Sequence, residues 1–238
     1  MLLNLFIFFR VISQKDVNVN KKKLPKDGAL NCKDLINENQ YFLNEGDHYF
    51  TCSSFDYCDT TELTIYNSNF RNFYLKLKGD TSYLFQTNNV NLNITSNTFT
   101  NIGVIHTMVY CDGNQEHFTF KSNNVNDCHS QQNVNGTIVE VFTRNTDIQN
   151  NVIFFRPDGK KGRAFKIKYH TGCKFIGNHI TNALYDKGCC LYFEHCADNF
   201  PTLQMSDCVF TSCHGDNSAI FYLANLATPL SIKNVTFE

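Results

Sequence analysis

The residues best suited to chemistry are a cluster of basic side chains between residues 156 and 174. Two of them, Lys166 and Lys168, are separated by one residue, which places both on one face of a strand. A basic strip of this kind attracts sulfated or acidic glycans, or phosphates, through charge and paired hydrogen bonds. The alternative is a solubilising edge that Glu140 and Glu194 partly neutralise. The candidate ligand-binding residues are Arg156, Lys160, Lys161, Arg163, Lys166, Lys168 and Lys174.

The eleven cysteines and eight histidines do not form a recognisable metal or redox site. No Cys-x-x-Cys pair is followed by a second pair or by two spaced histidines, which is the pattern of a zinc site. Histidines scattered in this way are more typical of solvated or packed side chains. The cysteines predict up to five disulfides in a secreted chain, or else small buried apolar side chains. We expect no metal and no cofactor.

A repeated sequence pattern predicts the strands that position these residues. Seven segments superimpose without gaps on an apolar anchor, with anchors 26 to 30 residues apart. A mostly apolar position lies two residues before each anchor, and an apolar residue lies five after it. Apolar residues at alternate positions follow the period of a strand with one buried face. The anchors, predicted to form one interior column, are Ile65, Ile94, Phe120, Ile148, Phe175, Met205 and Ile232.

Each unit bends at a doublet two and three residues after its anchor, usually made of Asn, Ser, Gly or Asp. Asn150-Asn151 is an example. Asn and Gly enter the left-handed region at low cost, and Asn and Asp can bond their own backbone. A bend that recurs at this spacing winds the chain into a coil. The sequence therefore predicts an all-β fold, a parallel β-helix of about seven coils.

A second strand follows each bend at a variable distance, and it begins with glycine in four of five copies. Aligning these strands places Glu140 beside Lys166, and Lys168 beside Glu194, in neighbouring coils. Stacked strands lie about 4.8 Å apart. We therefore predict two opposite-charge pairs on the outer face, each worth a few tenths of a kcal/mol. Chance alternation of charge is the alternative.

Two motifs recur together in the repeat: a turn, Asn-x-Phe-x-[Asn/Ser], and a strand, Gly-x-[Ala/Ile/Cys]-apolar. The turn is carried by residues 97–101, 178–182 and 208–212, and the strand by 188–191 and 218–221. In these motifs the chain resembles polymorphic-membrane-protein-like surface proteins, right-handed β-helices of chlamydiae and some parasitic protists within the pectin-lyase-like fold. It lacks the doubled glycine typical of that family. The resemblance implies a right-handed, secreted or surface-displayed β-helix used for adhesion or antigenic display.

Enzymes also occur on β-helices, so the fold alone does not decide the function. Polygalacturonase-like enzymes would show Asn-Thr-Asp, then an Asp pair, Gly-His-Gly and Arg-Ile-Lys. Asn145-Thr146-Asp147 is present, but the later motifs do not follow it. The sequence favours a non-enzymatic secreted or cell-surface protein for adhesion or binding of a glycan or other partner. The alternative is a carbohydrate-active enzyme, a polysaccharide lyase or hydrolase, whose carboxylates are brought together by loops.

The N-terminal sequence and the sequons predict the compartment. The apolar run at residues 2–9 is far shorter than the ~20 residues of a membrane span. It fits a short signal peptide over residues 1–13, although Asn4 interrupts it and Arg10 follows it. Glycosylation sequons lie at Asn93, Asn135 and Asn234. We expect a secreted or cell-surface protein without a transmembrane span.

The remaining predictions concern domains and partners. Residues 14–60 are predicted to be a leader and N-terminal cap, with 33–44 as a short amphipathic segment, and 61–238 the β-helix. A net charge of −1 argues against nucleic-acid partners. The expected partners are an acidic glycan or a host surface protein. The last coil, at Phe237 and Glu238, shows no cap, which predicts end-to-end association through strand edges.

Overall fold

The computed structural model describes the part of the chain that carries the repeat, together with four short strands before it. All elements of regular structure in the described residues are β-strands, and all their pairings are parallel. The described residues are 22–23, 28–31, 40–42, 48–53, 62–71, 83–104, 107–130, 136–156, 162–185, 190–196, 202–215, 220–225 and 230–238.

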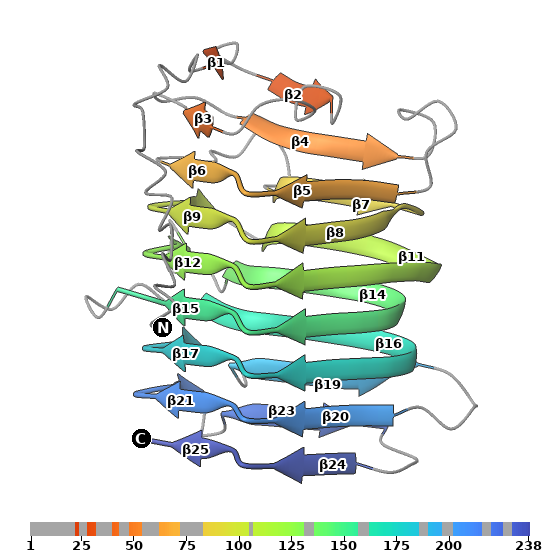
Figure 1. Ribbon diagram of the computed structural model, residues 1–238, viewed down its shortest axis with the longest axis vertical. Coiled ribbons are helices and arrows are strands. Elements are labelled where there is room, and N and C mark those ends of the chain that lie inside the picture. Colours follow the sequence, from red (N-terminus) through yellow and green to blue (C-terminus); the bar gives the residue numbers. More distant parts are fainter. Residues whose placement is uncertain are drawn as a thin grey trace, which may run out of the picture.

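The strands stack into a right-handed parallel β-helix, which confirms the predicted fold class. In Figure 1 the chain crosses the front in one direction and returns behind in the other, while it descends from the N-terminal strands to the C-terminal coil. Three faces surround one apolar core. The structure has about five turns, slightly fewer than the predicted seven coils.

Face 1 carries the anchors. Ile65 pairs in register with Ile94, and each later anchor pairs with the next, down to Met205 and Ile232. The first six are at most 4% exposed, whereas Ile232 on the last described coil is 40% exposed. The predicted interior column is therefore confirmed. Face 1 consists of β5 (Glu62–Tyr66), β8 (Asn91–Thr95), β20 (Thr202–Ser206), β24 (Leu230–Lys233) and the C-terminal parts of β11 (Thr107–Lys121), β14 (Gly136–Gln149) and β16 (Gly162–Ile176).

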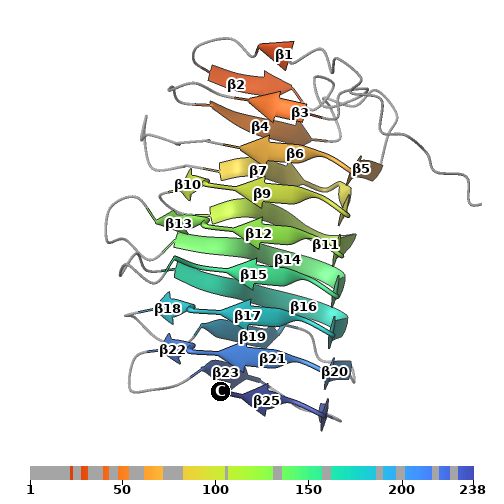
Figure 2. The same ribbon diagram turned by 60° about the vertical axis from the view of Figure 1, so that its left-hand side comes forward.

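Face 2 is a nine-stranded sheet, which runs down the centre of Figure 2. Its buried side chains are the apolar residues five positions after the first six anchors, such as Phe99 and Phe210. Its strands are β1 (Lys22–Lys23), β3 (Gln40–Phe42), β6 (Asn69–Arg71), β9 (Thr98–Thr100), β12 (Asn124–Asn126), β15 (Val152–Phe154), β17 (His179–Thr181), β21 (Val209–Thr211) and β25 (Thr236–Phe237).

Face 3 contains the second strand of each unit, and in three coils this strand continues directly onto face 1. The long strands β11, β14 and β16 run along face 3, turn a corner where the register shifts, and continue on face 1. Face 3 consists of their N-terminal parts with β2 (Gly28–Asn31), β4 (His48–Ser53), β7 (Tyr83–Asn88), β19 (Leu191–His195) and β23 (Phe221–Ala224). Two small sheets flank face 2: β10 (Gly103–Val104) with β13 (His129–Ser130), and β18 (Leu184–Tyr185) with β22 (His214–Gly215).

The segments before residue 61 lie only partly within the described residues. Residues 1–13, predicted as a signal peptide, lie outside them. Of the amphipathic segment 33–44, Gln40–Phe42 is described and forms β3, which pairs with β6 on face 2. Strands β2 and β4 extend face 3 in the same way. Strand pairing therefore reaches into the part of the chain where no repeat is visible in the sequence.

The first residue of every bend doublet has a positive φ, between 50° and 64°. Asn, Asp and Gly tolerate this region, and the two serines are short enough to enter it. The predicted role of the doublet is thus confirmed for its first position. These residues are Asn67, Ser96, Ser122, Asn150, Gly177, Asp207 and Asn234.

The second residue of the doublet has a different role from the one predicted. Asn97, Asn123, Asn151 and Asn178 are buried and stack as a ladder. In each, the side-chain amide donates to the anchor carbonyl of the preceding coil, as Asn151 Nδ2 does to Phe120 O at 2.8 Å. Their Oδ1 atoms accept from the backbone N–H of the second doublet residue in the preceding coil. The asparagines therefore join coils and do more than bend the chain locally.

Replacing Ser122 with valine is expected to destabilise the fold. Ser122 is exposed and has a φ of 53°, a region that β-branched residues avoid because Cβ clashes with the backbone. Such strain costs about 1–3 kcal/mol, so the urea midpoint should fall. Ser122→Asn is the matched control and should leave the midpoint nearly unchanged. Equal midpoints for both variants would contradict the steric argument.

Candidate functional site

The structure divides the predicted basic strip among different surfaces. Lys166 and Lys168 lie on alternate, outward positions of β16 on face 3. Lys174 belongs to the same strand but lies beyond the corner, on face 1. Arg156 follows β15 at the end of face 2, and Arg163 is 8% exposed. Lys160 and Lys161 lie outside the described residues. The strip is therefore not one continuous surface in the described part of the chain.

The two lysines on face 3 are neutralised by the neighbours predicted for them. Lys166 pairs with Glu140, and the Lys168 ammonium lies 2.8 Å from the Glu194 carboxylate. The hydrogen bond from Lys168 and a second from Tyr192 lower the pKa of Glu194 below its usual value. Both predicted charge pairs are thus confirmed, on stacked strands in the predicted register.

Both arginines of the strip have local partners. The Arg163 guanidinium lies 4.2 Å from the ring centre of Tyr185 and 5.6 Å from that of Tyr192. This stacking is worth about 0.5–2 kcal/mol, depending on desolvation. Arg156 forms an ion pair with Asp127. These contacts anchor the guanidinium groups against the coil.

Around the two lysines, face 3 has a hollow of about 300 Å³, which we call the face-3 hollow. Polar and aromatic groups alternate on its floor, because outward positions recur at every second residue of each strand. It spans four adjacent coils. Its lining residues are Tyr110, Asp112, Glu140, Val141, Phe142, Lys166, Lys168 and Cys196.

Two pairs of neighbouring tyrosines, one tilted and one stacked, lie at the two ends of this hollow. The rings of Tyr83 and Tyr110 have centres 5.0 Å apart, and those of Tyr192 and Tyr222 have centres 5.4 Å apart and lie nearly parallel. Tyr222 is 54% exposed, so this pair presents a flat apolar surface to solvent. The arrangement offers aromatic platforms along the axis of the β-helix.

In two of these tyrosines, Tyr110 and Tyr192, the hydroxyl is held by a carboxylate two residues further along the same strand. Tyr110 donates to Asp112, and Tyr192 donates to Glu194 at 2.9 Å. Burial, the hydrogen bond to Glu194 and its negative charge raise the pKa of Tyr192 to about 12. Sequence reasoning missed these residues. Their signal is an aromatic and an acidic residue at alternate positions of one strand, as in Tyr110-x-Asp112.

Two of the three sequons lie in described residues. Asn93 points outward from β8 on face 1, and the Thr95 hydroxyl of the same sequon donates to its Oδ1 at 2.6 Å. Asn234 is exposed in a bend, and its amide donates to Asp207 Oδ1. Asn135 lies outside the described residues. Glycosylation at these positions stays a prediction.

The seven cysteines whose side chains are described are free, and six of them are buried. The interpretation as small buried side chains therefore holds for those six, and no disulfide joins any of the seven. Burial raises the pKa of Cys111 and Cys128 to about 12. Because the thiolate is the reactive form, these thiols are inert.

No protein-family model, curated protein or solved structure matches this chain. In the described residues, no helix has the length and hydrophobicity needed to cross a membrane. The assignment to a β-helix therefore depends on the strand register and the repeat.

Proposed function

We propose that the chain is a non-enzymatic, secreted or cell-surface β-helix that binds a glycan through the face-3 hollow. The observation that carries this proposal is the alternation of aromatic side chains and paired charges on the outward positions of face 3. A concave surface with aromatic walls and a few convergent polar groups is the usual form of a ligand site.

The groups in the hollow match the chemistry of a sugar. Aromatic rings such as Tyr110 and Phe142 present apolar faces to the C–H groups of a pyranose. The ion pairs Lys166–Glu140 and Lys168–Glu194 supply donors and acceptors side by side, which hydroxyl groups can use in both directions. Since these lysines are already neutralised, the hollow favours an uncharged glycan. An acidic ligand, which the sequence suggested for this strip, gains little attraction here.

The hydrogen bonds of two carboxylates in and beside the hollow, Glu140 and Glu194, favour binding over acid catalysis. Glu194 accepts hydrogen bonds from Lys168 and Tyr192, which lower its pKa, whereas a general acid needs a raised pKa. Glu140 accepts from Lys166 and from the Thr107 hydroxyl. The carbohydrate-active enzyme remains the alternative function, and depolymerisation of a polysaccharide by the purified chain would establish it.

The proposed location is supported by the sequence and agrees with the thiols. The resemblance to polymorphic-membrane-protein-like surface proteins and the sequons favour the cell surface or secretion. Buried thiols with raised pKa values, such as Cys111 and Cys128, resist oxidation outside the cell. A host surface protein is a further proposed partner. End-to-end association also stays a prediction, supported by the half-exposed Leu230, Ile232 and Phe237 of the last described coil.

Replacing Phe142 or Tyr110 with alanine is expected to abolish glycan binding or weaken it at least tenfold. Loss of one aromatic platform costs about 1.4 kcal/mol or more, which corresponds to that factor. The measurement is a glycan array, followed by titration of the best ligand. Tyr66→Ala is the matched control, because Tyr66 is 62% exposed on face 1, away from the hollow. Binding that survives both face-3 substitutions, or that falls equally with the control, would contradict the proposal.

A further inference from the structure

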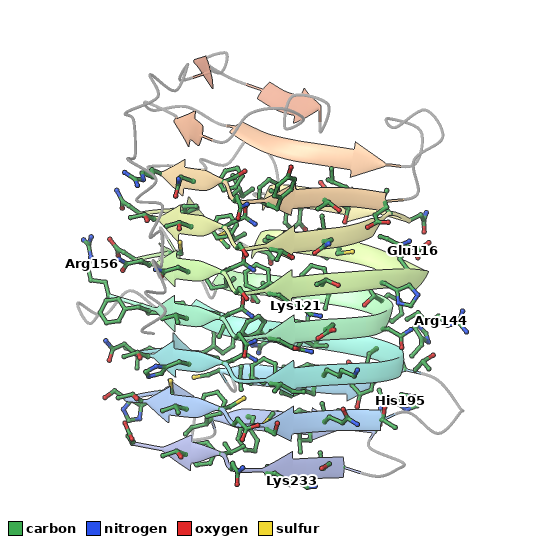
Figure 3. The ribbon with its side chains drawn as sticks, in the orientation of Figure 1. Glu116, Lys121, Arg144, Arg156, His195 and Lys233 are labelled. Carbon is green, nitrogen blue, oxygen red and sulfur yellow. The ribbon has the colours of Figure 1, made fainter. Side chains whose placement is uncertain are left out.

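A second hollow, of about 330 Å³, lies at the corner where faces 3 and 1 meet. Figure 3 shows Glu116 and Arg144 at this edge of the β-helix, beside the strands that turn the corner. It shares no lining residue with the face-3 hollow. We call it the corner cup. The residues that carry the argument are His117, Asn145, Asp147, Gly172, Lys174 and Thr202.

The cup exists because one side chain is missing from a column. Three residues before the anchors, His117, Asn145, Gly172 and Thr202 stack in register on successive coils. A Cβ on Gly172 would lie 3.3 Å from Asn145 Oδ1 and 3.4 Å from Thr202 Oγ1. An extra residue in β16 at the corner shifts the register next to this gap. Such bulges redirect side chains and are common beside functional sites.

The cup has an excess of one positive charge. Both carboxylate oxygens of Asp147 are already engaged: Gln149 donates to Oδ1 at 2.6 Å, and the Lys121 ammonium lies 2.7 Å from Oδ2. Lys174 lies beside Asp147 on the next coil, is exposed, and forms no ion pair within the described residues. Glu116 and Arg144 at the same edge carry opposite charges. The Lys174 ammonium is therefore the charge available to a ligand.

The remaining polar groups of the cup are mainly donors. Asn145 Nδ2 lies 3.3 Å from His117 Nδ1. Because an amide nitrogen only donates, Nδ1 accepts in this contact. The hydroxyl of Thr202 and the three N–H groups of Lys174 add further donors. Each carboxylate oxygen of Asp147 already has one partner, so the remaining donors of the cup suit a ligand that supplies acceptors.

We propose that the corner cup binds a single sulfate group, as the sulfate ester of a glycan. A sulfate ester is a monoanion with three terminal oxygens, which matches one excess positive charge and several donors. A phosphate monoester carries nearly two charges at pH 7, which exceeds the one excess positive charge of the cup. A carboxylate has two oxygens and leaves donors unused. The cup thus adds a site for an anionic group to a surface whose face-3 hollow favours neutral sugars.

Galactose 6-sulfate is the probe for this site, with galactose, galactose 6-phosphate and glucuronate as comparators. Titration of the full chain followed by calorimetry or NMR should show binding of the sulfate ester that is at least tenfold tighter than that of each comparator. Lys174→Gln should weaken this binding about tenfold or more, the loss of one charge-assisted contact. Lys233→Gln is the matched control, an exposed lysine on the same face at the last described coil (Figure 3).

Gly172→Ala tests the shape of the cup without changing its charge. The added methyl group should reduce sulfate binding as strongly as Lys174→Gln, while the urea midpoint stays close to that of the unmodified chain. Phe142→Ala should leave sulfate binding unchanged, which separates this site from the face-3 hollow. Equal affinity for phosphate or glucuronate, or sulfate binding that survives Lys174→Gln, would overturn the proposal.

Discussion

Replacing Asn151 with alanine should lower the free energy of unfolding by about 3–5 kcal/mol, since several buried polar groups lose their partners at once. Asn151 is fully buried. Its Oδ1 accepts from the backbone N–H of Asn123 at 2.9 Å, and its Nδ2 donates to Phe120 O and to Asn178 Oδ1. Alanine leaves the N–H of Asn123 and the carbonyl of Phe120 without these bonds in an apolar interior.

Urea unfolding followed by circular dichroism measures this effect. Asn124→Ala is the matched control, because Asn124 points outward from β12 and is exposed. It should change the free energy of unfolding by no more than about 0.5 kcal/mol, as surface substitutions usually do. A loss below about 1 kcal/mol for Asn151→Ala would show that the ladder does not hold the coils together.

Phe175→Ala is expected to cost about 3–5 kcal/mol, because it leaves a cavity in a close-packed column. The Phe175 side chain is fully buried and packs edge-on against two rings, with centres 5.2 Å from Phe165 and 5.5 Å from Phe193. These neighbours belong to face 3, so Phe175 joins the two faces across the core. The cavity cannot close without shifting strands on both.

Thermal and urea unfolding of this variant should be compared with Phe154→Ala. Phe154 is 38% exposed on the outward side of β15, so its truncation should cost much less. Phe175→Leu should fall between the two, because leucine fills most of the space. Similar losses for Phe175→Ala and Phe154→Ala would contradict the assignment of the interior column.

The features predicted correctly from the sequence are those that depend on neighbours within one strand. The alternation around anchors such as Ile94 and Phe120 identifies the buried face, and a doublet such as Asn150-Asn151 identifies the bend. The charge pair Glu140–Lys166 follows from the same alignment, because residues in stacked strands meet at fixed register. All these signals repeat with the coil.

The parts that sequence reasoning missed arise where the repeat is interrupted. Lys168 and Lys174 are six residues apart in one strand, and a straight strand would place them on one face. The corner after Tyr169 sends them to different faces. The corner cup could not be predicted from the repeat either, because it depends on one extra residue and one glycine in β16. The inter-coil bonding of the asparagines depends on burial, which local propensity does not report.

The ion pairs on face 3 also determine which coil can follow which. The core columns and the asparagine ladder would accept a duplicated coil, because each presents the same surface above and below. A second copy of the coil that carries Lys166 and Lys168 would instead lay lysine over lysine, which is unfavourable between stacked strands. The interior of this solenoid would thus tolerate a change in the order of the coils. The charge pairs on face 3, in contrast, favour the order in which the coils occur in the chain.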